Sequence, residues 1–443
     1  MKLRWPSREP ARPLRRKPCS LRAAVVLLAV GAVGCCAWLS KKSNTAPSTV
    51  ATAAPRRTSA ACNYAGVVLA DGRCDCGAPW TGANCSFLDA LPTLPEGAGG
   101  FSQRASSSSI WGASPIRDDD GLYHVFASKM ALECPVFGAD NQQYWLTNSY
   151  VVRGEASRPE GPYEEKEVVL GDRGPARWDG RQQHNPTIRR AADGTYLLFY
   201  TGTTFEGPRP SCVGGARPSL ADARPLAERA RSRQQIGVAV APHPRGPWTR
   251  PDWPSLRTAD AAPDGFDGRF NTNPSPLVLG NDSVLLVYKG VRRAKPFRMR
   301  FGVAFAPHYA SPAYARLATG RPLFSDLCGG AGCDIEDAFA WRDGAVFHML
   351  FKDQTGAFAG EADGGARATS HDALAWALAG KAYSRSTRLG SRAVDLTFRE
   401  RSQLLFDASG RPTHLFNAVL EGAKGEHTWN AATPLRGYGS PAR

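Results

Sequence analysis

One sequence unit is repeated along the chain and is clearest in His184-Asn-Pro-Thr-Ile188 followed by Tyr196-Leu-Leu-Phe-Tyr200. An Asp-Gly turn joins its two parts. The unit begins with a short polar, Pro-containing segment, continues as an apolar strand and turns into a strand of aromatic and aliphatic residues. Asp-Gly between two such runs is a strong hairpin signal. Four further copies follow the same plan: Ala113-Ser-Pro-Ile116 with Leu122-Tyr-His-Val-Phe126, Thr272-Asn-Pro-Ser-Pro276 with Val284-Leu-Leu-Val-Tyr288, Glu336-Asp-Ala-Phe339 with Val346-Phe-His-Met-Leu350, and Arg399-Glu-Arg-Ser-Gln-Leu404 with Thr413-His-Leu-Phe-Asn417.

Five copies, spaced by roughly 60–90 residues of strand and turn, predict an all-β, five-bladed β-propeller over residues 104–434. A two-sheet sandwich is the alternative all-β architecture. It would not explain why the same strand start occurs five times.

The N-terminal part of the chain has the pattern of a type II membrane anchor. Residues 23–39 are an uncharged apolar run, near the lower length limit for crossing a bilayer. Residues 1–22 are strongly basic, which places them in the cytosol as a short tail. Residues 40–61, rich in Ser, Thr, Ala and Pro, are expected to form a flexible stalk. The alternative is a cleaved signal peptide with an unusually long basic region.

The net charge of +15 does not indicate nucleic-acid binding, because it is concentrated in the tail. Residues 1–61 hold twelve Lys or Arg and one acid, Glu9, so only +4 remains for the rest of the chain. No broad basic face is left there for a phosphate backbone. The sequence therefore predicts a membrane contact through residues 23–39 and no nucleic-acid partner.

A small cysteine-rich motif occupies residues 62–86. Its spacing is Cys-x11-Cys-x-Cys-x8-Cys and its last part reads Cys76-Gly-Ala-Pro-Trp-Thr-Gly-Ala-Asn-Cys85. This resembles the C-terminal half of an EGF-like domain. The resemblance implies a disulfide between Cys76 and Cys85, which leaves Cys62 for Cys74. A zinc knuckle is the alternative, although no histidine lies nearby.

Two Asn-x-Ser sequons follow from the expected lumenal position. Asn84 belongs to one of them, but its middle residue is a cysteine expected to be disulfide-bonded. Asn281, in an expected turn, is the better acceptor. The propeller is accordingly predicted to lie in the Golgi lumen or at the cell surface.

The repeated unit resembles the five-bladed propellers of the glycoside hydrolase families 43, 32 and 68. In that fold the first residues of each innermost strand point into a central funnel, and the chemistry needs two carboxylates on either side of a sugar ring. This sequence departs from the family pattern, because its first strand start, Trp111-Gly-Ala-Ser-Pro115, carries no acid. The resemblance implies a carbohydrate partner, and it leaves a metal open, since some members of the group hold calcium at the propeller centre. We identify no set of metal ligands in this sequence and predict no cofactor.

Carboxylates occur at the last two strand starts, which makes Glu336, Asp337 and Glu400 candidate catalytic residues. Glu336 is our predicted general acid. The competing interpretation pairs it with Arg399 or Arg401 in a structural ion pair, which would lower its pKa when a general acid needs a raised one. Side chains predicted to line the substrate site are His184, Asn185, Asn273, Arg399, Arg401 and Trp111.

Asp179 and Asp267 are further candidates, because each stands six residues before a funnel asparagine in the pattern Asp-Gly-Arg-x3-Asn-Pro. They could replace the missing carboxylates. They could equally cap turns, since Asp-Gly is a turn dipeptide.

Enlarged loops are expected to form the rim of the funnel. If residues 130–147 and 205–234 lie on neighbouring blades, Cys134 and Cys212 can form a disulfide, and a helix is predicted at 220–231. A Cys328–Cys333 disulfide would stiffen the loop before Glu336. A basic run in blade three is either a solvated surface or a site for an acidic glycan, uronic or sulfated: Arg292, Arg293, Lys295, Arg298 and Arg300.

The sequence thus predicts a membrane-anchored, glycan-active protein that hydrolyses or transfers glycosyl units through paired carboxylates. The alternatives are a non-catalytic propeller that binds glycans or proteins, favoured by the missing first-blade acid, and a structural scaffold.

Overall fold

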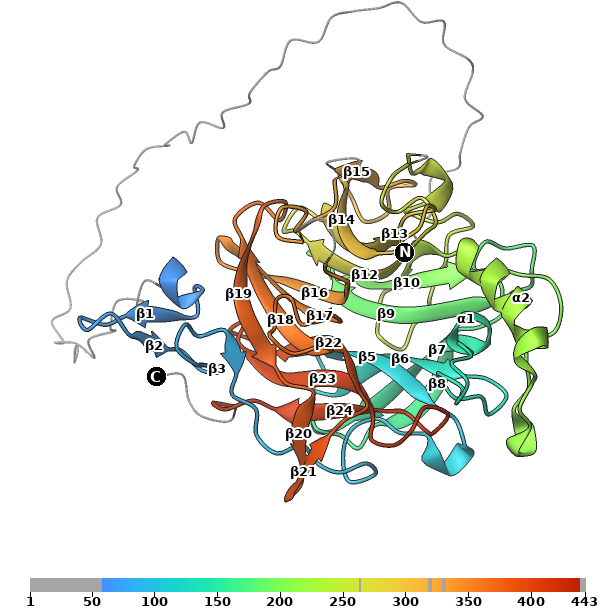
Figure 1. Cartoon of the computed structure of the whole chain (residues 1–443), viewed down its shortest axis with the longest axis horizontal. Helices are drawn as coiled ribbons and strands as arrows, with labels where there is room; N and C mark the ends of the chain where they lie inside the picture. Colours follow the sequence, from blue (N-terminus) through green and yellow to red (C-terminus); the bar gives the residue numbers. More distant parts are fainter. Residues whose placement is uncertain (1–57, 263, 318–320, 329–331, 439–443) are drawn as a thin grey trace, which may run out of the picture. The chain divides into compact units, whose positions relative to one another are not determined.

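The computed structural model describes residues 58–438, apart from 263, 318–320 and 329–331. Within these residues, five antiparallel sheets follow one another around the molecule as the blades of a propeller (Figure 1). Blade one is β5 (Ile110–Arg117), β6 (Tyr123–Met130), β7 (Ser149–Ala156) and β8 (Glu164–Leu170); blade two is β9 (Gln182–Arg190), β10 (Tyr196–Thr203) and β11 (Gln235–Ala241). Blade three is β12 (Phe270–Val278), β13 (Val284–Val291), β14 (Met299–Ala306) and β15 (Ala315–Leu317); blade four is β16 (Ile335–Asp343), β17 (Val346–Asp353), β18 (Gly364–Ser370) and β19 (Trp376–Tyr383); blade five is β22 (Phe398–Phe406), β23 (Pro412–Leu420) and β24 (Trp429–Pro434).

The predicted repeats correspond to the first two strands of each blade, so the five-bladed propeller is confirmed. The hairpin turns contain Gly194, Gly344 and Gly410, all at positive φ (87°, 55° and 82°), where a residue without a Cβ is favoured. Apolar side chains fill the spaces between neighbouring sheets. Between blades three and four, for example, Val287 and Phe301 pack with Met349 and Phe351.

The ring is closed by the segment that precedes blade one. Phe101 exchanges backbone hydrogen bonds of 2.9 Å with Asn430 in β24, and Leu91 donates to the carbonyl of Pro434. Figure 1 shows the last blade (red) returning beside the first (cyan). A hairpin outside the blades, β20 (Ser386–Leu389) with β21 (Arg392–Asp395), bonds to the same segment through Thr93.

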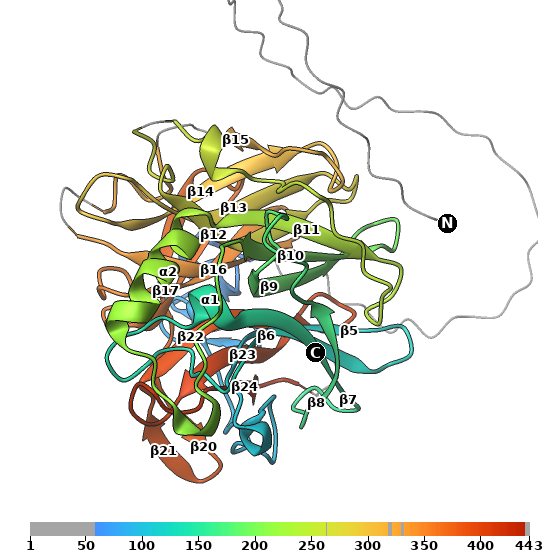
Figure 2. The same cartoon turned by 90° about the vertical axis from the view of Figure 1, so that its right-hand side faces the viewer.

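Two helices lie on the rim, between strands of blades one and two. They are α1 (Trp145–Asn148) and α2 (Leu220–Ser232), and they contact each other beside β9 (Figure 2). The predicted helix at 220–231 is therefore confirmed. Ser219 caps it by accepting a hydrogen bond from the Asp222 amide at 3.2 Å.

The cysteine-rich motif is a small unit of β1 (Gly66–Val68), β2 (Cys74–Cys76), β3 (Trp80–Thr81) and β4 (Phe87–Leu88), preceded by the 3-10 turn Ala60–Cys62. Its disulfides join Cys62 to Cys74 and Cys76 to Cys85. Arg367 of β18 fixes it to blade four. The Arg367 guanidinium lies 3.6 Å from the centre of the Trp80 ring and donates to the carbonyls of Cys85 (2.7 Å) and Asn63 (3.1 Å).

The predicted tail, membrane segment and most of the stalk, residues 1–57, lie outside the described residues. Among the residues that are described, no helix has the length and apolar character needed to cross a membrane.

Candidate functional site

Each innermost strand carries a β-bulge at the same place, near its start. The pairing register shifts in all five blades, and the bulged residue has a positive φ: Gly112 (65°), Asn185 (50°), Asn273 (53°), Asp337 (60°) and Arg401 (54°). Asn and Asp tolerate this conformation, whereas it is strained for arginine. The bulges turn the same position of every blade toward the propeller axis.

Four of the bulged side chains form a polar ring around that axis. Asn185 Nδ2 donates to Asn273 Oδ1 at 2.8 Å, and Asn273 Nδ2 donates to Asp337 Oδ1 at 2.5 Å. Arg401 Nη1 lies 3.5 Å from Asp337 Oδ1, and its backbone amide donates to Asp337 Oδ2 at 3.2 Å. The predicted site residues Asn185, Asn273, Asp337 and Arg401 are therefore brought together, as a buried support beneath the funnel.

The fifth position, Gly112, explains how the ring closes without a first-blade acid. A Cβ at Gly112 would lie 3.3 Å from Arg401 Cγ and Nε and 3.4 Å from Asn185 Oδ1. The Arg401 side chain thus occupies the space that a side chain at residue 112 would need.

A cluster of alternating charges lies next to the ring. Lys289 Nζ contacts Glu336 Oε2 at 2.7 Å. Lys352 Nζ contacts three carboxylates: Glu400, Asp363 at 3.0 Å, and Glu336 at 3.5 Å. Lys289, Lys352 and Glu400 are each more than nine-tenths buried. These opposite charges compensate one another in a site with little water.

The two glutamates of this cluster have very different acidities. Burial raises the pKa of the Glu400 carboxyl to about 7; Lys352 opposes this shift, and the charges of Glu336 and Asp337 add to it. Burial would also raise the pKa of Glu336, but Lys289 and Lys352 outweigh burial and lower it to about 2. Glu336 is therefore the stronger acid of the two, and Glu400 is the carboxyl that burial drives toward its protonated form, against the contact with Lys352.

The interactions of Glu336 argue against the role of general acid that we predicted for it. A lowered pKa leaves no proton to donate, and Glu400 has the raised pKa that the role requires. Glu336 is ion-paired, as the competing interpretation predicted, but its partners are Lys289 and Lys352 instead of Arg399 and Arg401. Arg399 instead donates to Asn417 Oδ1 at 3.1 Å and to the Ser384 carbonyl at 2.9 Å.

The structure places Asp179 and Asp267, the two further catalytic candidates, inside blades, where both are buried and bonded to side chains of the turn-fastening kind that the alternative interpretation expects. Asp179 accepts from Tyr200 (2.7 Å), Arg173 (2.6 Å) and Arg250 (3.2 Å). Asp267 repeats the arrangement in blade three, accepting from Tyr288 (2.9 Å) and Arg316 (2.6 Å). The repeated Asp-Gly-Arg motif therefore fastens the loop before each innermost strand to its own blade.

Trp111 and His184 are held by their neighbours. Trp111 is 3% exposed and packs edge-on against Phe137 and Phe398, so its predicted contact with substrate is wrong. His184 stacks on Trp145 with ring centres 5.0 Å apart, and its Nδ1 lies 2.8 Å from Ser149 Oγ. Burial, together with Arg401 and Lys289, lowers the pKa of the His184 imidazole well below its usual range. This histidine is neutral at physiological pH.

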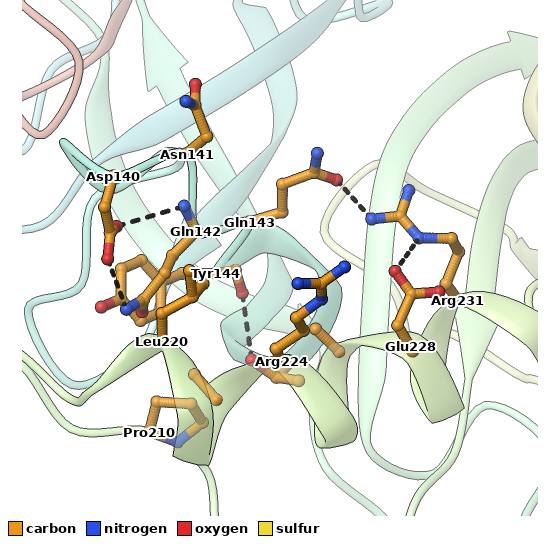
Figure 3. Close-up of a pocket in the computed structure, with 13 residues that line it drawn as sticks. Asp140, Asn141, Gln142, Gln143, Tyr144, Pro210, Leu220, Arg224, Glu228 and Arg231 are labelled. Atoms are coloured by element: carbon orange, nitrogen blue, oxygen red, sulfur yellow. Dashed lines mark hydrogen bonds and ion pairs between the residues drawn. The ribbon is translucent and has the colours of Figure 1, made fainter.

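The rim loops form a wall with its own cavity, of about 230 Å³, between α2 and the loop 130–147. Figure 3 shows Arg231 of α2 between Gln143, to which it donates at 2.8 Å, and Glu228. The predicted Cys134–Cys212 disulfide links the two loops, and the predicted Cys328–Cys333 disulfide precedes β16.

Glu336, Asp337 and Glu400 each place a carboxylate oxygen within 4.8 Å of the others, close enough for one cation to bridge them. Lys289, Lys352 and Arg401 already supply three positive charges to these three carboxylates. The donor set therefore does not fit a divalent metal.

Sequence reasoning missed Lys289 and Lys352, although a signal was present. Both stand directly opposite the residue before a bulge, Lys289 opposite Thr272 and Lys352 opposite Glu336. Each is also a lysine at the end of an apolar run in the second strand of its blade. A buried charge needs a partner, so two such lysines indicate carboxylates on the adjacent strands.

The fold has relatives among solved structures. A glycoside hydrolase matches over 78% of this chain and 92% of its own, with a TM-score of 0.56 and 14% identity. BT0996, solved as an RGII complex, matches over 79% and 92%, with a TM-score of 0.54 and 14% identity. The fold is a five-bladed propeller with structural neighbours among glycoside hydrolases. Zg3597, a family 117 glycoside hydrolase from the marine bacterium Zobellia galactanivorans, matches over 78% and 88%, with a TM-score of 0.49 and 15% identity. No protein-family model and no curated protein matches the chain.

The raised pKa of Glu400 has a consequence for stability. Between its unfolded value near 4.5 and about 7, the native carboxyl binds more protons than the unfolded one. The free energy of unfolding therefore falls as pH rises through this window. We expect Glu400→Gln to remove this decline in urea unfolding curves recorded at successive pH values. An unchanged slope would show that Glu400 titrates at an ordinary pKa in the native protein.

Proposed function

We propose that the protein is a glycan-active hydrolase or transglycosylase in which Glu400 donates the proton and Glu336 is the ionised carboxylate. The observation that supports this assignment is the cluster of Glu336, Asp337 and Glu400, whose carboxylate oxygens lie within 4.8 Å of one another beside the polar ring. The pKa shifts of Glu336 and Glu400, in opposite directions, agree with a division of roles between them. Pairs of titratable groups whose surroundings drive their pKa values apart are typical of acid–base sites.

Each residue of the cluster has a part in this chemistry. Glu400 protonates the leaving glycosidic oxygen. As the glycosidic bond breaks, Glu336, which Lys289 keeps ionised, bonds to the anomeric carbon and forms a glycosyl ester. Water or an acceptor hydroxyl, which gives its proton to Glu400, then displaces Glu336 from the sugar. Lys352 contacts both carboxylates and fixes their separation. Their oxygens lie within 4.8 Å, closer to the roughly 5–5.5 Å of retaining enzymes than to the roughly 6.5–9.5 Å of inverting ones. Retention at the anomeric carbon is therefore the expected outcome.

One observation favours the second candidate, a propeller that binds glycans without cleaving them. Lys352 lies between the two glutamates, and Arg401 fills the place of the missing first-blade side chain. In this function the same charges would hold sugar hydroxyls by hydrogen bonds, and no proton would be transferred.

A glycan-release assay separates the two functions. The full-length chain, in detergent micelles, is incubated with neutral and acidic polysaccharides over a range of pH, and new reducing ends are counted. A hydrolase that uses Glu400 releases sugar at mildly acidic pH and loses activity as pH rises through about 7. Glycan binding without release at any pH would support the binding propeller.

We further propose that residues 23–39 anchor the protein so that the propeller faces the lumen. Asn281 is exposed, and its side-chain oxygen accepts from Ser283 of its own sequon at 2.6 Å. We expect one N-glycan, at Asn281, in protein made by a secretory cell. Glycosidase treatment should shift the parent by one glycan, and Asn281→Gln should abolish the shift.

Asn84→Gln is the matched control, because the Asn84 amide nitrogen already donates to the Ala379 carbonyl at 2.9 Å and the sequon contains a disulfide-bonded Cys85. An unglycosylated Asn281 in a secretory cell would contradict the lumenal orientation.

A further inference from the structure

A second cavity, of about 470 Å³, lies between blades two and three and is lined by three arginines, Arg233, Arg269 and Arg293. No Asp or Glu is among the described residues that line it. Its size falls within the roughly 300–1,000 Å³ of small-ligand sites. The cavity is distinct from the rim cavity of Figure 3, which contains both acids and bases.

The cavity is on the face of the propeller at which the innermost strands begin. Trp178 precedes β9, and Arg269 directly precedes β12. Arg293 lies two residues after the end of β13. The bulged residues Asn185 and Asn273 lie a few positions along the same two strands. A chain-like ligand in the funnel can therefore extend across the rim into this cavity.

Contacts with neighbouring groups hold Arg269 and Arg293 in place, but not every arginine of the cavity is paired with a carboxylate. Arg269 is held by Glu228 at 3.0 Å, and its guanidinium lies 3.9 Å from the centre of the exposed Phe297 ring. Arg293 donates Nε to the Gly268 carbonyl, and no carboxylate of the described residues pairs with it or with Arg233. Both Arg233 and Arg293 are exposed. Two guanidinium groups are thus free to bind an anion.

From this arrangement we infer that the cavity is an anionic-sugar subsite, which binds the carboxylate of a uronic acid or the sulfate of a sulfated sugar. The inference rests on the proposed glycan-active function and names its substrate class. Planar guanidinium groups bind such oxyanions through paired hydrogen bonds. The side chains of Thr204, Ser232 and Gln235, which also line the cavity, can bond the sugar hydroxyls. Trp178 adds a half-buried aromatic wall.

The test compares two double variants that remove equal charge. Arg233→Gln/Arg293→Gln changes the cavity, whereas Arg217→Gln/Arg229→Gln removes two exposed arginines nearby that do not line it. Binding of the full-length chain to dextran, dextran sulfate and polygalacturonate is measured at physiological salt by biolayer interferometry. Each lost guanidinium should weaken binding to the anionic polymers about tenfold. The control pair should bind within about twofold of the parent, because neither arginine lines the cavity and isolated exposed charges act weakly.

The two anionic polymers identify the source of the charge. A loss on polygalacturonate only assigns the cavity to uronates, and a loss on dextran sulfate only assigns it to sulfated sugars. Equal losses in both double variants would mean diffuse charge attraction and overturn the inference, as would undiminished binding of the cavity variant or a parent that binds neither polymer. Because binding is measured without turnover, a chain that binds acidic glycans but releases none refutes the catalytic function alone.

Discussion

Glu400→Gln should lower kcat on an unactivated glycan by about 10²- to 10⁴-fold, because the amide cannot donate the proton that the leaving oxygen needs. The substitution preserves shape and still offers an oxygen to Lys352, so the fold should be unchanged. The decline of activity above about pH 7 should vanish with it, since that decline reports the pKa of Glu400.

Aryl glycosides test whether the lost function is proton donation. A dinitrophenyl leaving group departs without protonation, so Glu400→Gln should keep nearly the parent kcat/KM on such a substrate, because kcat/KM reports the step in which the leaving group departs. Glu164→Gln, an exposed carboxylate on the outer strand of blade one, is the matched control and should leave both substrates unaffected. Equal loss on both substrate classes would assign Glu400 to binding or positioning instead of acid catalysis.

Lys352→Met should reduce the free energy of unfolding by about 3–5 kcal/mol, the usual cost of removing one partner from a buried ion pair. Lys352 is 4% exposed and contacts Glu336, Asp363 and Glu400, so its loss leaves carboxylates buried without their cation. Urea unfolding followed by tryptophan fluorescence measures the change.

Two comparisons make this result specific. Lys166→Met removes a lysine from an exposed pair with Glu164 and should change stability by no more than about 0.5 kcal/mol. Adding Glu400→Gln to Lys352→Met should recover part of the loss, because one orphaned carboxylate disappears. If Lys352→Met costs no more than Lys166→Met, the cluster does not stabilise the propeller.

The propeller could be predicted from the sequence because each blade repeats a local pattern of strand, turn and strand. The Asp193-Gly194 turn and the Asn-Pro strand starts depend only on nearby residues. The Cys76–Cys85 and Cys62–Cys74 disulfides are the ones that the EGF-like resemblance implies. The Cys328–Cys333 disulfide and the helix over 220–231 depend on nearby residues, and the Cys134–Cys212 disulfide follows from the blade order once the fold is known.

The chemistry of the centre could not be derived in the same way, because it depends on contacts between blades. Lys289 of blade three pairs with Glu336 of blade four, and Lys352 of blade four pairs with Glu400 of blade five. Lys289 and Lys352 lower the pKa of Glu336, whereas burial raises the pKa of Glu400. For Asp179 and Asp267 the contacts lie within single blades. Their repeated spacing suggested carboxylates for the funnel, but Tyr200 and Tyr288 donate hydrogen bonds to them inside their own blades.

The ring closure also determines which part of the chain must stay together when its gene is recombined. The outer pairing of blade five comes from residues 90–101, and Arg367 of blade four is buried against Trp80 and Cys85 of the cysteine-rich motif. A gene fragment that began at residue 104 would encode a propeller without the segment that pairs with β24, and Arg367 would lose its contacts with Trp80 and Cys85. The cysteine-rich motif is therefore no interchangeable module. In recombination or domain shuffling it has to travel with the propeller.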